Sequence, residues 1–563
     1  MPAAVLLAGA LLIAWLLVDP RTPDLAAQVY RLGLYERNGF GVYDEHWYAG
    51  HDLPGYSLLF APLAALVGMR ALAVCAVLVS TALFEQIALG VFGDELCVRL
   101  GACLFAVAAV GDVWSGRLTF ALGVTFALAC AYALYREHLL VAAVCAAVCA
   151  AASPVAGVLL ALAGLTYALA QGDAWALVAL AAPVALVLVP VRALFPEGGF
   201  EPYPATSFAA TVVVVVAFVC ALPRGAGHGR TLRIGALVYL LACVVCLLVH
   251  TPMGSNVERY GVLLAGPLLL CALAGSGVRL GSGRRGRGLG RGRGRRSAAG
   301  AGLSPFMPGS RSRRARRASI SGMGAVVVGL AVCAIGVWIV WGPVRETTAV
   351  AGAPATRAAY YAPVTRYLLR HGASTERVEV LLTRSHWEAA ELAPSISLAR
   401  GWEKQLEERY DSVLLRARLT ASSYRAWLHE QAVAYVALPD VPLDSSSAQE
   451  GTLIRRGLPY LRPVFASTHW RVYEVRDATP ILSGPGRLTA LGNESFALEA
   501  RTAGTLLARV HYTRYDTVVS GDACVSDAPG GWTYVHARAR GRIVVEAKFS
   551  VSRALGLGGA CTG

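Results

Sequence analysis

Residues 19–55 carry an unusual density of side chains that could do chemistry. Asp24 lies just after a long apolar run, where a carboxylate could deprotonate an acceptor hydroxyl or help to bind a divalent ion that neutralises a phosphate. Pro23 precedes it and is typical of a helix start, so Asp24 could instead be a first-turn acid that complements the helix dipole. Further groups that could bind a phosphate or stack on a sugar follow: Arg31, Trp47, His51, Asp52 and Tyr56.

Two later polar segments between apolar runs add candidates for the same site. Asp112 and Arg117, in residues 111–117, fit either a binding site or a simple loop ion pair. Asn256, Arg259 and Tyr260 could bind a phosphate or a sugar, or could only mark the interface at the head of a span. Because the first 342 residues contain no lysine, the phosphate would have to be bound by Arg31, Arg117, Arg259 or His51, and arginine can do so bidentately.

The acidic side chains in these segments favour Mg²⁺ or Mn²⁺ as a cofactor. Asp24 together with Asp112 or Asp52 would provide the oxygen ligands that these ions prefer. His46 and His51 are five residues apart, but a dedicated zinc site requires three or four ligands at tetrahedral spacing. The sequence therefore favours Asp24 and Asp112 as ligands of such an ion.

The composition indicates a membrane protein. Of the 563 residues, 56% are hydrophobic and only 15% are charged, and the mean hydropathy is +0.52, whereas about 25% of residues are charged in a soluble domain. Apolar runs suited to a ~30 Å hydrocarbon core, some of them short, are residues 3–18, 70–92, 97–110, 118–135, 139–152, 154–170, 174–194, 206–222, 234–250, 260–277 and 322–342. We therefore expect about 11 transmembrane helices, with a core over residues 1–277 and a last helix within 320–342.

The placement of arginine predicts the orientation in the plasma membrane. Residues 278–319 hold 13 arginines and no acid, so most of the +15 net charge lies in one segment, and we expect no nucleic-acid partner. This segment should be disordered and cytoplasmic, where anionic lipid attracts it. The N-terminus is then cytoplasmic, and residues 19–69, 111–117, 251–259 and everything after 342 are outside. This number of membrane crossings requires residues 56–68 to form an interfacial helix that does not cross the membrane.

After residue 342 the composition becomes that of a soluble protein. Residues 343–477 alternate between helix-like and strand-like patterns, which predicts an extracytoplasmic α/β domain. Residues 478–563 show short strands separated by turn residues, which predicts a small β-sandwich. Cys524 and Cys561 are the two cysteines of this polar region and could form a disulfide in an oxidising compartment.

The order of the features in the first 342 residues resembles the glycosyltransferase-C superfamily, which includes the lipid A aminoarabinose transferase and the protein O-mannosyltransferases. An acidic outer motif after the first span is followed by the stretch W-Y-x-G-H-x-x-P-G-Y-S at residues 47–57, an interfacial helix and a second span. Residues 110–123 resemble the second outer loop of the superfamily, which bears an aspartate. Residues 254–267 are similar to the late outer motif that binds the lipid phosphate or the sugar.

The resemblance implies a catalytic carboxylate in the first outer loop, a role that falls to Asp24 by position, and a sugar donor linked to polyprenyl phosphate. One departure is that the aminoarabinose transferases have a Glu-Lys pair before the proline and aromatic stretch, whereas this chain has His51, Asp52 and Leu53 before Pro54. The composition also resembles that of actinobacterial membrane proteins labelled as transporters, which leaves a non-catalytic member of the superfamily open.

These observations lead to one hypothesis and two alternatives. The first is an enzyme, a hexosyl- or pentosyltransferase that moves a sugar from a polyprenyl-phosphate donor to a glycan or lipid acceptor of the cell envelope, with Asp24 as general base. The second is a transporter or flippase of envelope precursors, favoured by helices broken at sites such as Ser153-Pro154. The third is a non-catalytic envelope scaffold.

Overall fold

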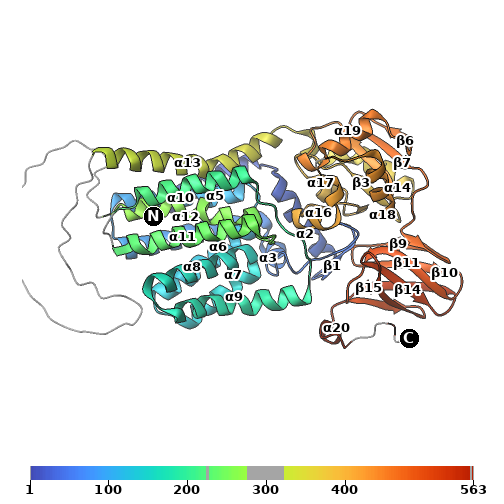
Figure 1. The fold of residues 1–563 in the computed structure, drawn as a ribbon, viewed down its shortest axis with the longest axis horizontal. Coiled ribbons are helices and arrows are strands. Elements are labelled where there is room, and N and C mark those ends of the chain that lie inside the picture. The colour runs from blue at the N-terminus through green and yellow to red at the C-terminus, as the bar shows by residue number, and fades with distance from the viewer. Residues whose placement is uncertain (1, 224–226, 275–321, 417, 558–560, 562–563) are drawn as a thin grey trace, which may run out of the picture.

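The computed structural model describes residues 2–223, 227–274, 322–416, 418–557 and 561. The predicted loop at 278–319 lies outside these residues. A bundle of helices forms one end of the molecule, two β-containing domains form the other, and α2 and α3 lie between them (Figure 1).

Every predicted apolar run coincides with a helix over its described residues. These helices are α1 (Ala3–Val18), α4 (Met69–Phe92), α5 (Leu96–Trp114), α6 (Leu118–Tyr135), α7 (Leu139–Ala152), α8 (Pro154–Gln171), α9 (Ala174–Leu194), α10 (Ala205–Ala221), α11 (Gly227–Leu248), α12 (Glu258–Ala272) and α13 (Gly322–Val350). Within the described ranges, seven are long and apolar enough to cross a membrane: α4, α5, α6, α8, α9, α11 and α13. α1 meets this criterion only together with α2 (Pro23–Asn38), to which it is bent by 79°. The total of about 11 crossings stays a prediction.

Local backbone signals set the breaks between helices. Asp19 takes a left-handed conformation (φ 47°) and ends α1 just before the chain turns into α2. Ser153 accepts a hydrogen bond from the Ala156 amide at 3.3 Å and caps α8, while Pro154 fits the first helical position and stops α7 from continuing. Both breaks bring polar backbone to the end of the bundle nearest the C-terminal domains.

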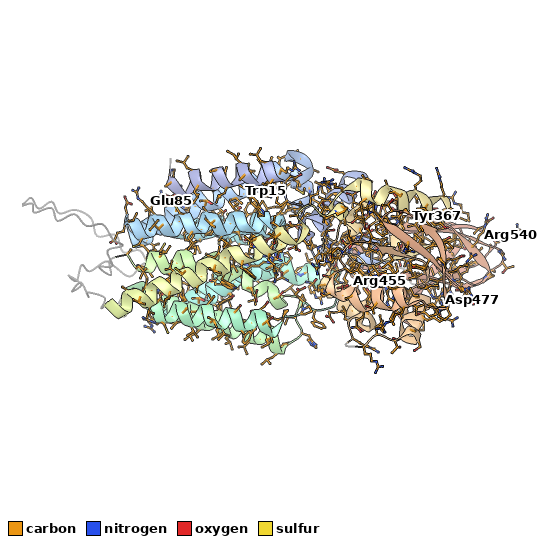
Figure 2. All side chains as sticks on the ribbon, turned by 90° about the horizontal axis from the view of Figure 1, so that it is seen from above. Trp15, Glu85, Tyr367, Arg455, Asp477 and Arg540 are labelled. Carbon is orange, nitrogen blue, oxygen red and sulfur yellow. A yellow bond between two sulfur atoms is a disulfide. The ribbon has the colours of Figure 1, made fainter. Side chains whose placement is uncertain are left out.

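Small residues line the buried faces of the bundle. On α5 these include Gly101, Ala102 and Ala106, which allow neighbouring helices to approach closely. Large apolar side chains such as Leu186 of α9 point outward and are exposed, as expected for contact with lipid. Figure 2 shows Glu85 of α4 towards the end of the bundle that is remote from the C-terminal domains.

Residues 19–69 form a compact insertion. After α2 comes a short hairpin of β1 (Tyr43–Asp44) and β2 (His51–Asp52), then α3 (Phe60–Val67), which lies inside the predicted interfacial segment. The hairpin is held from several sides: Tyr30 donates its hydroxyl proton to Asp44 Oδ2 at 2.8 Å, Asn493 Nδ2 donates to Asp44 Oδ1 at 2.9 Å, and the Tyr43 hydroxyl donates to the His511 carbonyl at 2.6 Å. The insertion therefore joins the bundle to both C-terminal domains.

The first C-terminal domain has α/β architecture. Its five strands lie in the order β4-β3-β5-β7-β6, with β3 parallel to β4 and β5, and the other pairs antiparallel. The strands are β3 (Arg377–Val380), β4 (Ser397–Leu398), β5 (Val433–Pro439), β6 (Leu461–Ala466) and β7 (Trp470–Val475). The helices are α14 (Ala358–Arg370), α15 (Glu388–Glu391), α16 (Lys404–Tyr410), α17 (Ser412–Leu415), α18 (Ala421–Glu430) and α19 (Ala448–Arg456).

The second C-terminal domain is a β-sandwich. One sheet has the order β12-β15-β10-β9 and the other β13-β14-β11-β8, and apolar side chains such as Phe496, Leu506 and Val535 fill the space between them. The strands are β8 (Leu482–Ser483), β9 (Gly486–Leu491), β10 (Ser495–Ala500), β11 (Gly504–His511), β12 (Asp516–Ser520), β13 (Ala523–Ala528), β14 (Trp532–Ala537) and β15 (Gly541–Ala547), followed by α20 (Val551–Ala554). Cys524 and Cys561 form a disulfide, the pairing that the sequence suggests.

Candidate functional site

A cavity of about 590 Å³ lies where the helical bundle meets the α/β domain. Its walls come from five segments at the end of the bundle for which the placement of arginine predicts an outer position, and from the start of α16. The lining residues used below are Asp24, Gln28, Tyr56, Arg117, Ser153, Val155, Val158, Leu188, Val191, Arg192, Glu197, Glu201, Asn256, Arg259, Glu403 and Lys404. Outer segments far apart in the sequence thus meet at one site.

Asp24 and Arg117 form the centre of the polar wall. Asp24 lies in the first turn of α2, and Arg117 precedes α6. The guanidinium of Arg117 donates from Nε to Asp24 Oδ2 at 3.2 Å and from Nη2 to Glu346 Oε1 at 3.0 Å, and its Nη1 lies 3.9 Å from Asp112 Oδ1. Arg117 is therefore paired with three carboxylates and acts as a clamp that orients Asp24.

Gly116 permits this clamp. Its φ of +83° is in the left-handed region, and a Cβ atom at this position would overlap the backbone nitrogen of Leu25. The turn before Arg117 can therefore lie directly against the start of α2, next to Asp24.

Arg259 offers an uncommitted cation to the cavity. It lies in the first turn of α12, above the ring of Phe120 at 5.3 Å, and Asn256 of the preceding turn η1 (Gly254–Val257) lines the cavity beside it. Among the described residues, its guanidinium has no hydrogen-bond or ion-pair partner. Arg259 is thus the arginine of this wall that is best placed to bind an incoming anion.

Glu197 and Glu201 enter the cavity from the loop between α9 and α10. Glu201 accepts a hydrogen bond from the Ser255 hydroxyl at 3.1 Å, and burial raises the pKa of its carboxyl to about 7. Burial, with a contribution from Asp52, raises the pKa of the Glu197 carboxyl to about 8. Two carboxyl groups that take up protons near neutral pH therefore line the same space as Asp24.

Apolar side chains also line the cavity. They are Val155 and Val158 of α8 and Leu188 and Val191 of α9, beside the charged Arg192 of α9. Among the described spans, α9 has the smallest share of its apolar stretch buried, 11%, so its outer side is free to contact lipid. The cavity consequently combines charged side chains with apolar side chains that lead towards the membrane-facing side of the bundle.

The structure brings several residues singled out from the sequence together at the cavity: Asp24, Tyr56, Arg117, Asn256 and Arg259. Arg31 lies behind them, where it pairs with Glu403 and stacks over the ring of Tyr56 at 3.7 Å. Tyr56 also accepts a hydrogen bond from Gln28 Nε2. Arg31 therefore supports the wall and is not free to meet a phosphate.

Other predicted residues do not line the cavity, and their contact with substrate stays a prediction. Trp47 is 0% exposed, stacks on Tyr30 with ring centroids 4.4 Å apart, and donates from Nε1 to the Ala389 carbonyl at 3.2 Å. Tyr260 packs against Tyr239, at a centroid distance of 5.6 Å. Their rings are not part of the cavity lining; Trp47 anchors the hairpin to the α/β domain.

Asp112, His51 and Asp52 also lie outside the cavity lining. Asp112 is buried beside Arg117, so the cation between Asp24 and Asp112 is an arginine, and the two acids do not face an open metal position. Asp52 is on β2, and burial raises the pKa of its carboxyl to about 7. His51 faces two carboxylates behind the cavity wall.

The sequence reasoning missed Glu197, Glu201, Glu403 and Lys404. A signal for the first two was present, because they are the acids of a Pro- and Gly-rich segment between the apolar runs ending at 194 and beginning at 206, on the predicted outer side. Glu403 and Lys404 gave no such signal, since their place at the cavity depends on how the α/β domain docks.

No family model and no curated protein matches the sequence. Among solved structures, the arabinofuranosyltransferase AftD from Mycobacteria is 12% identical with a TM-score of 0.44, and the alignment covers 97% of this chain and 57% of that one. Two structures of a mutant of that enzyme are each 13% identical, with TM-scores of 0.46 and 0.40, and cover 97% and 98% of this chain. The present chain matches 57–60% of the length of these neighbours. At this level of similarity, only the residues of the cavity can indicate the chemistry.

Proposed function

We propose that this protein is a membrane glycosyltransferase that moves a sugar from a polyprenyl-phosphate donor to a hydroxyl of a cell-envelope acceptor at the outer face of the plasma membrane. The observation that carries the proposal is the cavity itself, which is lined by Asp24, by Arg259, which is unpaired among the described residues, and by apolar residues of α8 and α9. An amphiphilic donor with an anionic link between sugar and lipid requires such a combination.

Each wall has a role in this reaction. Arg259, with Asn256 beside it, binds the phosphate, because an unpaired guanidinium can donate two parallel hydrogen bonds to phosphate oxygens. The first isoprene units lie along Val155, Val158, Leu188 and Val191. Burying this apolar surface contributes about 25 cal/mol per Å² removed from water.

Asp24 acts as the general base. Arg117 holds one carboxylate oxygen, Oδ2, and leaves the other to accept the proton of the acceptor hydroxyl as it attacks the anomeric carbon. The C–O bond to the phosphate breaks, the phosphate leaves as an anion beside Arg259, and the anomeric configuration inverts. Glu201, whose pKa is raised towards neutrality, is the competing base in the same cavity.

The test is transfer of labelled sugar by the purified full chain in lipid nanodiscs from a panel of polyprenyl-phosphate hexoses and pentoses. We expect Asp24→Asn to lower turnover by about 10²–10⁴-fold, the usual contribution of a general base. Asp19→Asn is the matched control, because Asp19 lies at the same corner of the chain but pairs with Arg70 at 2.6 Å, outside the cavity lining. Its turnover should equal that of the unmodified protein.

Unchanged turnover in a folded Asp24→Asn protein would refute the role of Asp24. If Glu201→Gln abolished turnover while Asp24→Asn did not, the role of base would pass to Glu201. If no donor supported transfer by protein with a normal thermal transition, the glycosyltransferase proposal itself would fail.

A further inference from the structure

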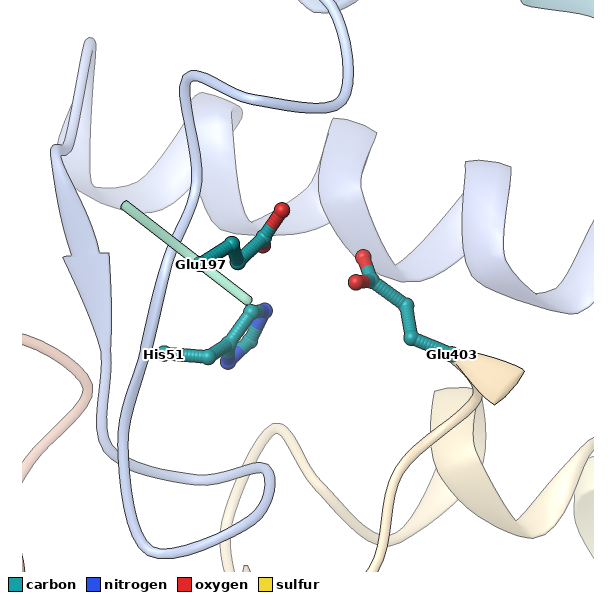
Figure 3. A group of neighbouring side chains, drawn as sticks. All are labelled: His51, Glu197 and Glu403. Atoms are coloured by element: carbon teal, nitrogen blue, oxygen red, sulfur yellow. The ribbon is translucent and has the colours of Figure 1, made fainter. Parts of the chain in front are cut away.

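Three possible metal ligands meet behind the polar wall of the cavity. His51 on β2, Glu197 after α9 and Glu403 before α16 each offer one ligand atom, and these atoms lie within 4.8 Å of one another. Figure 3 shows the imidazole and the two carboxylates turned towards a common space. Glu197 and Glu403 also line the cavity, so this cluster has one side open to it.

His51 is in the form that binds metal ions. Its Nδ1 lies 3.2 Å from the Asp44 carbonyl oxygen, and since a carbonyl can only accept, Nδ1 carries the proton. Nε2 therefore presents a lone pair, and it is buried with no hydrogen-bond partner among the described residues. The side chain is 3% exposed. A histidine that donates its other N–H to a carbonyl is the usual metal-bound arrangement.

The carboxylate of Glu197 has no close partner among the described residues, and that of Glu403 is paired with one arginine. Glu197 has no hydrogen-bond or ion-pair partner for its carboxylate within the described part of the chain, and its Oε1 is buried. Glu403 is 9% exposed and pairs with Arg31, which is itself covered by Tyr56. A metal ion at this place would supply the positive charge that a buried pair of ionised acids needs.

We propose that His51, Glu197 and Glu403 form a site for one divalent transition-metal ion, Zn²⁺ or Mn²⁺. A set of one imidazole nitrogen and two carboxylate oxygens suits these ions better than Mg²⁺ or Ca²⁺, which prefer oxygen alone. Zinc bonds of about 2.1 Å in a tetrahedron place ligand atoms about 3.4 Å apart. The ligand atoms here lie within 4.8 Å of one another, and the unpartnered carboxylate of Glu197 can turn towards His51 and Glu403 to shorten these distances.

The role of the ion rests on the proposed function. With three protein ligands, the ion keeps a coordination position on the side of Glu197 and Glu403 that faces the cavity. The negative charge of a donor phosphate oxygen bound at that position would be stabilised by the metal ion as well as by Arg259. The phosphate would therefore be a better leaving group. The site differs from the predicted Asp24 and Asp112 pair, between which Arg117 already lies.

The test is direct metal binding by the full chain in nanodiscs after treatment with a chelator. We expect one Zn²⁺ or Mn²⁺ per chain in calorimetric titration, with Mg²⁺ and Ca²⁺ binding at least about 10-fold more weakly. Glu197→Gln should weaken binding of Zn²⁺ and Mn²⁺ by more than about 10-fold, since even residues that only support ligands contribute 10–100-fold. Glu201→Gln, four residues away in the same loop and outside the cluster, is the matched control and should bind as the unmodified protein does.

A second measurement keeps the test independent of folding effects. Pulsed electron paramagnetic resonance of the Mn²⁺-loaded protein should show coupling to an imidazole nitrogen, which His51→Gln should remove. Absence of stoichiometric binding by folded protein, or unchanged binding in both Glu197→Gln and Glu403→Gln, would overturn the site. Metal binding without any sugar transfer would support the site and contradict the proposed function. Sugar transfer by protein that binds no metal would support the proposed function and contradict the site.

Discussion

Two arginines of this protein are each surrounded by carboxylates, and they differ in what lies beside them. Arg117 meets Asp24, Asp112 and Glu346 at the cavity wall, and its side chain is 24% exposed. Arg400, in the α/β domain, is 0% exposed and closed in on every side. The comparison teaches that similar ion clusters serve different purposes: a closed one holds a fold together, and an open one keeps a carboxylate ready for a substrate.

The Arg400 cluster takes its charged partners from its own domain. Arg400 donates to Glu379 Oε1 at 2.9 Å from Nε and to Glu450 Oε2 at 2.7 Å from Nη2, and Glu407 lies 3.6 Å away. The Tyr424 hydroxyl donates to Glu450 at 2.6 Å. Burial raises the pKa of Glu379 and of Glu450, while Arg400 opposes the shift, so the cluster holds together only around its cation.

The largest effect on stability should follow from Arg400→Met. Removing the cation leaves several buried acids without a counter-charge, and breaking a buried ion pair in this way costs about 3–5 kcal/mol of unfolding free energy. Chemical unfolding of the full chain in nanodiscs, monitored by a signal from the α/β domain, measures the loss. Arg455→Met is the control, because Arg455 lies on the exposed side of α19 in the same domain and has no ion-pair partner among the described residues (Figure 2).

The pH dependence of this variant provides a check on the cause. The pKa of Glu379 is raised in the folded state above its ordinary value of 4.5, so the carboxyl favours the folded protein when protonated and opposes folding once it ionises. The deficit of Arg400→Met should therefore be smallest near pH 4.5 and grow as the pH rises above it. A deficit independent of pH would point to lost packing instead.

Arg117→Gln should lower turnover much more than it lowers stability. Because Arg117 and Asp24 are partly exposed, losing their ion pair should cost about 1 kcal/mol of stability or less, and the loss of the cation beside the buried Asp112 adds to this. Turnover should fall by about 10²-fold, since Asp24 loses the clamp that orients it and small misplacements of a reacting group have effects of this size. The decrease should lie in kcat, with KM for the donor little changed, because Arg117 acts through Asp24.

Glu346→Gln removes one carboxylate partner of Arg117 but leaves the ion pair between Arg117 and Asp24 in place. Glu346 shares Arg117 but is not part of the cavity lining, so this variant should retain most of the turnover that Arg117→Gln loses. A KM effect in Arg117→Gln as large as its kcat effect would show that Arg117 binds the donor itself, and the distinction between the open and the closed cluster would weaken.

The sequence predicts this fold well where one physical signal dominates. Every predicted apolar run is helical because lipid-facing residues must be apolar over the whole length of a helix. The sandwich was predicted from short strands separated by turn residues, such as those that became β10 and β15, whereas the two-residue β8 is too short to show any pattern.

The site was predictable only in part, because loop position does not fix side-chain direction. Asp24 and Arg259 reach the cavity as expected. Trp47 does not, since its ring stacks on Tyr30 and its Nε1 donates to the carbonyl of Ala389, which lies 342 residues further along the chain. Glu403 was missed for the same reason, because contacts between the bundle and the α/β domain leave no local pattern in the sequence.

The smallest effect should come from an ion pair that belongs to neither cluster. Arg462 and Glu474 pair across the neighbouring strands β6 and β7, and their side chains are 58% and 37% exposed. In water, the attraction between such charges is offset by their hydration and by the side-chain entropy lost in pairing, so Arg462→Gln should change stability by about 0–1 kcal/mol and leave turnover unchanged. The thermal transition and the transfer assay measure both. A loss comparable to that of Arg400→Met would mean that burial is not what distinguishes the closed cluster, because the same charges would then count equally at the surface and in the core.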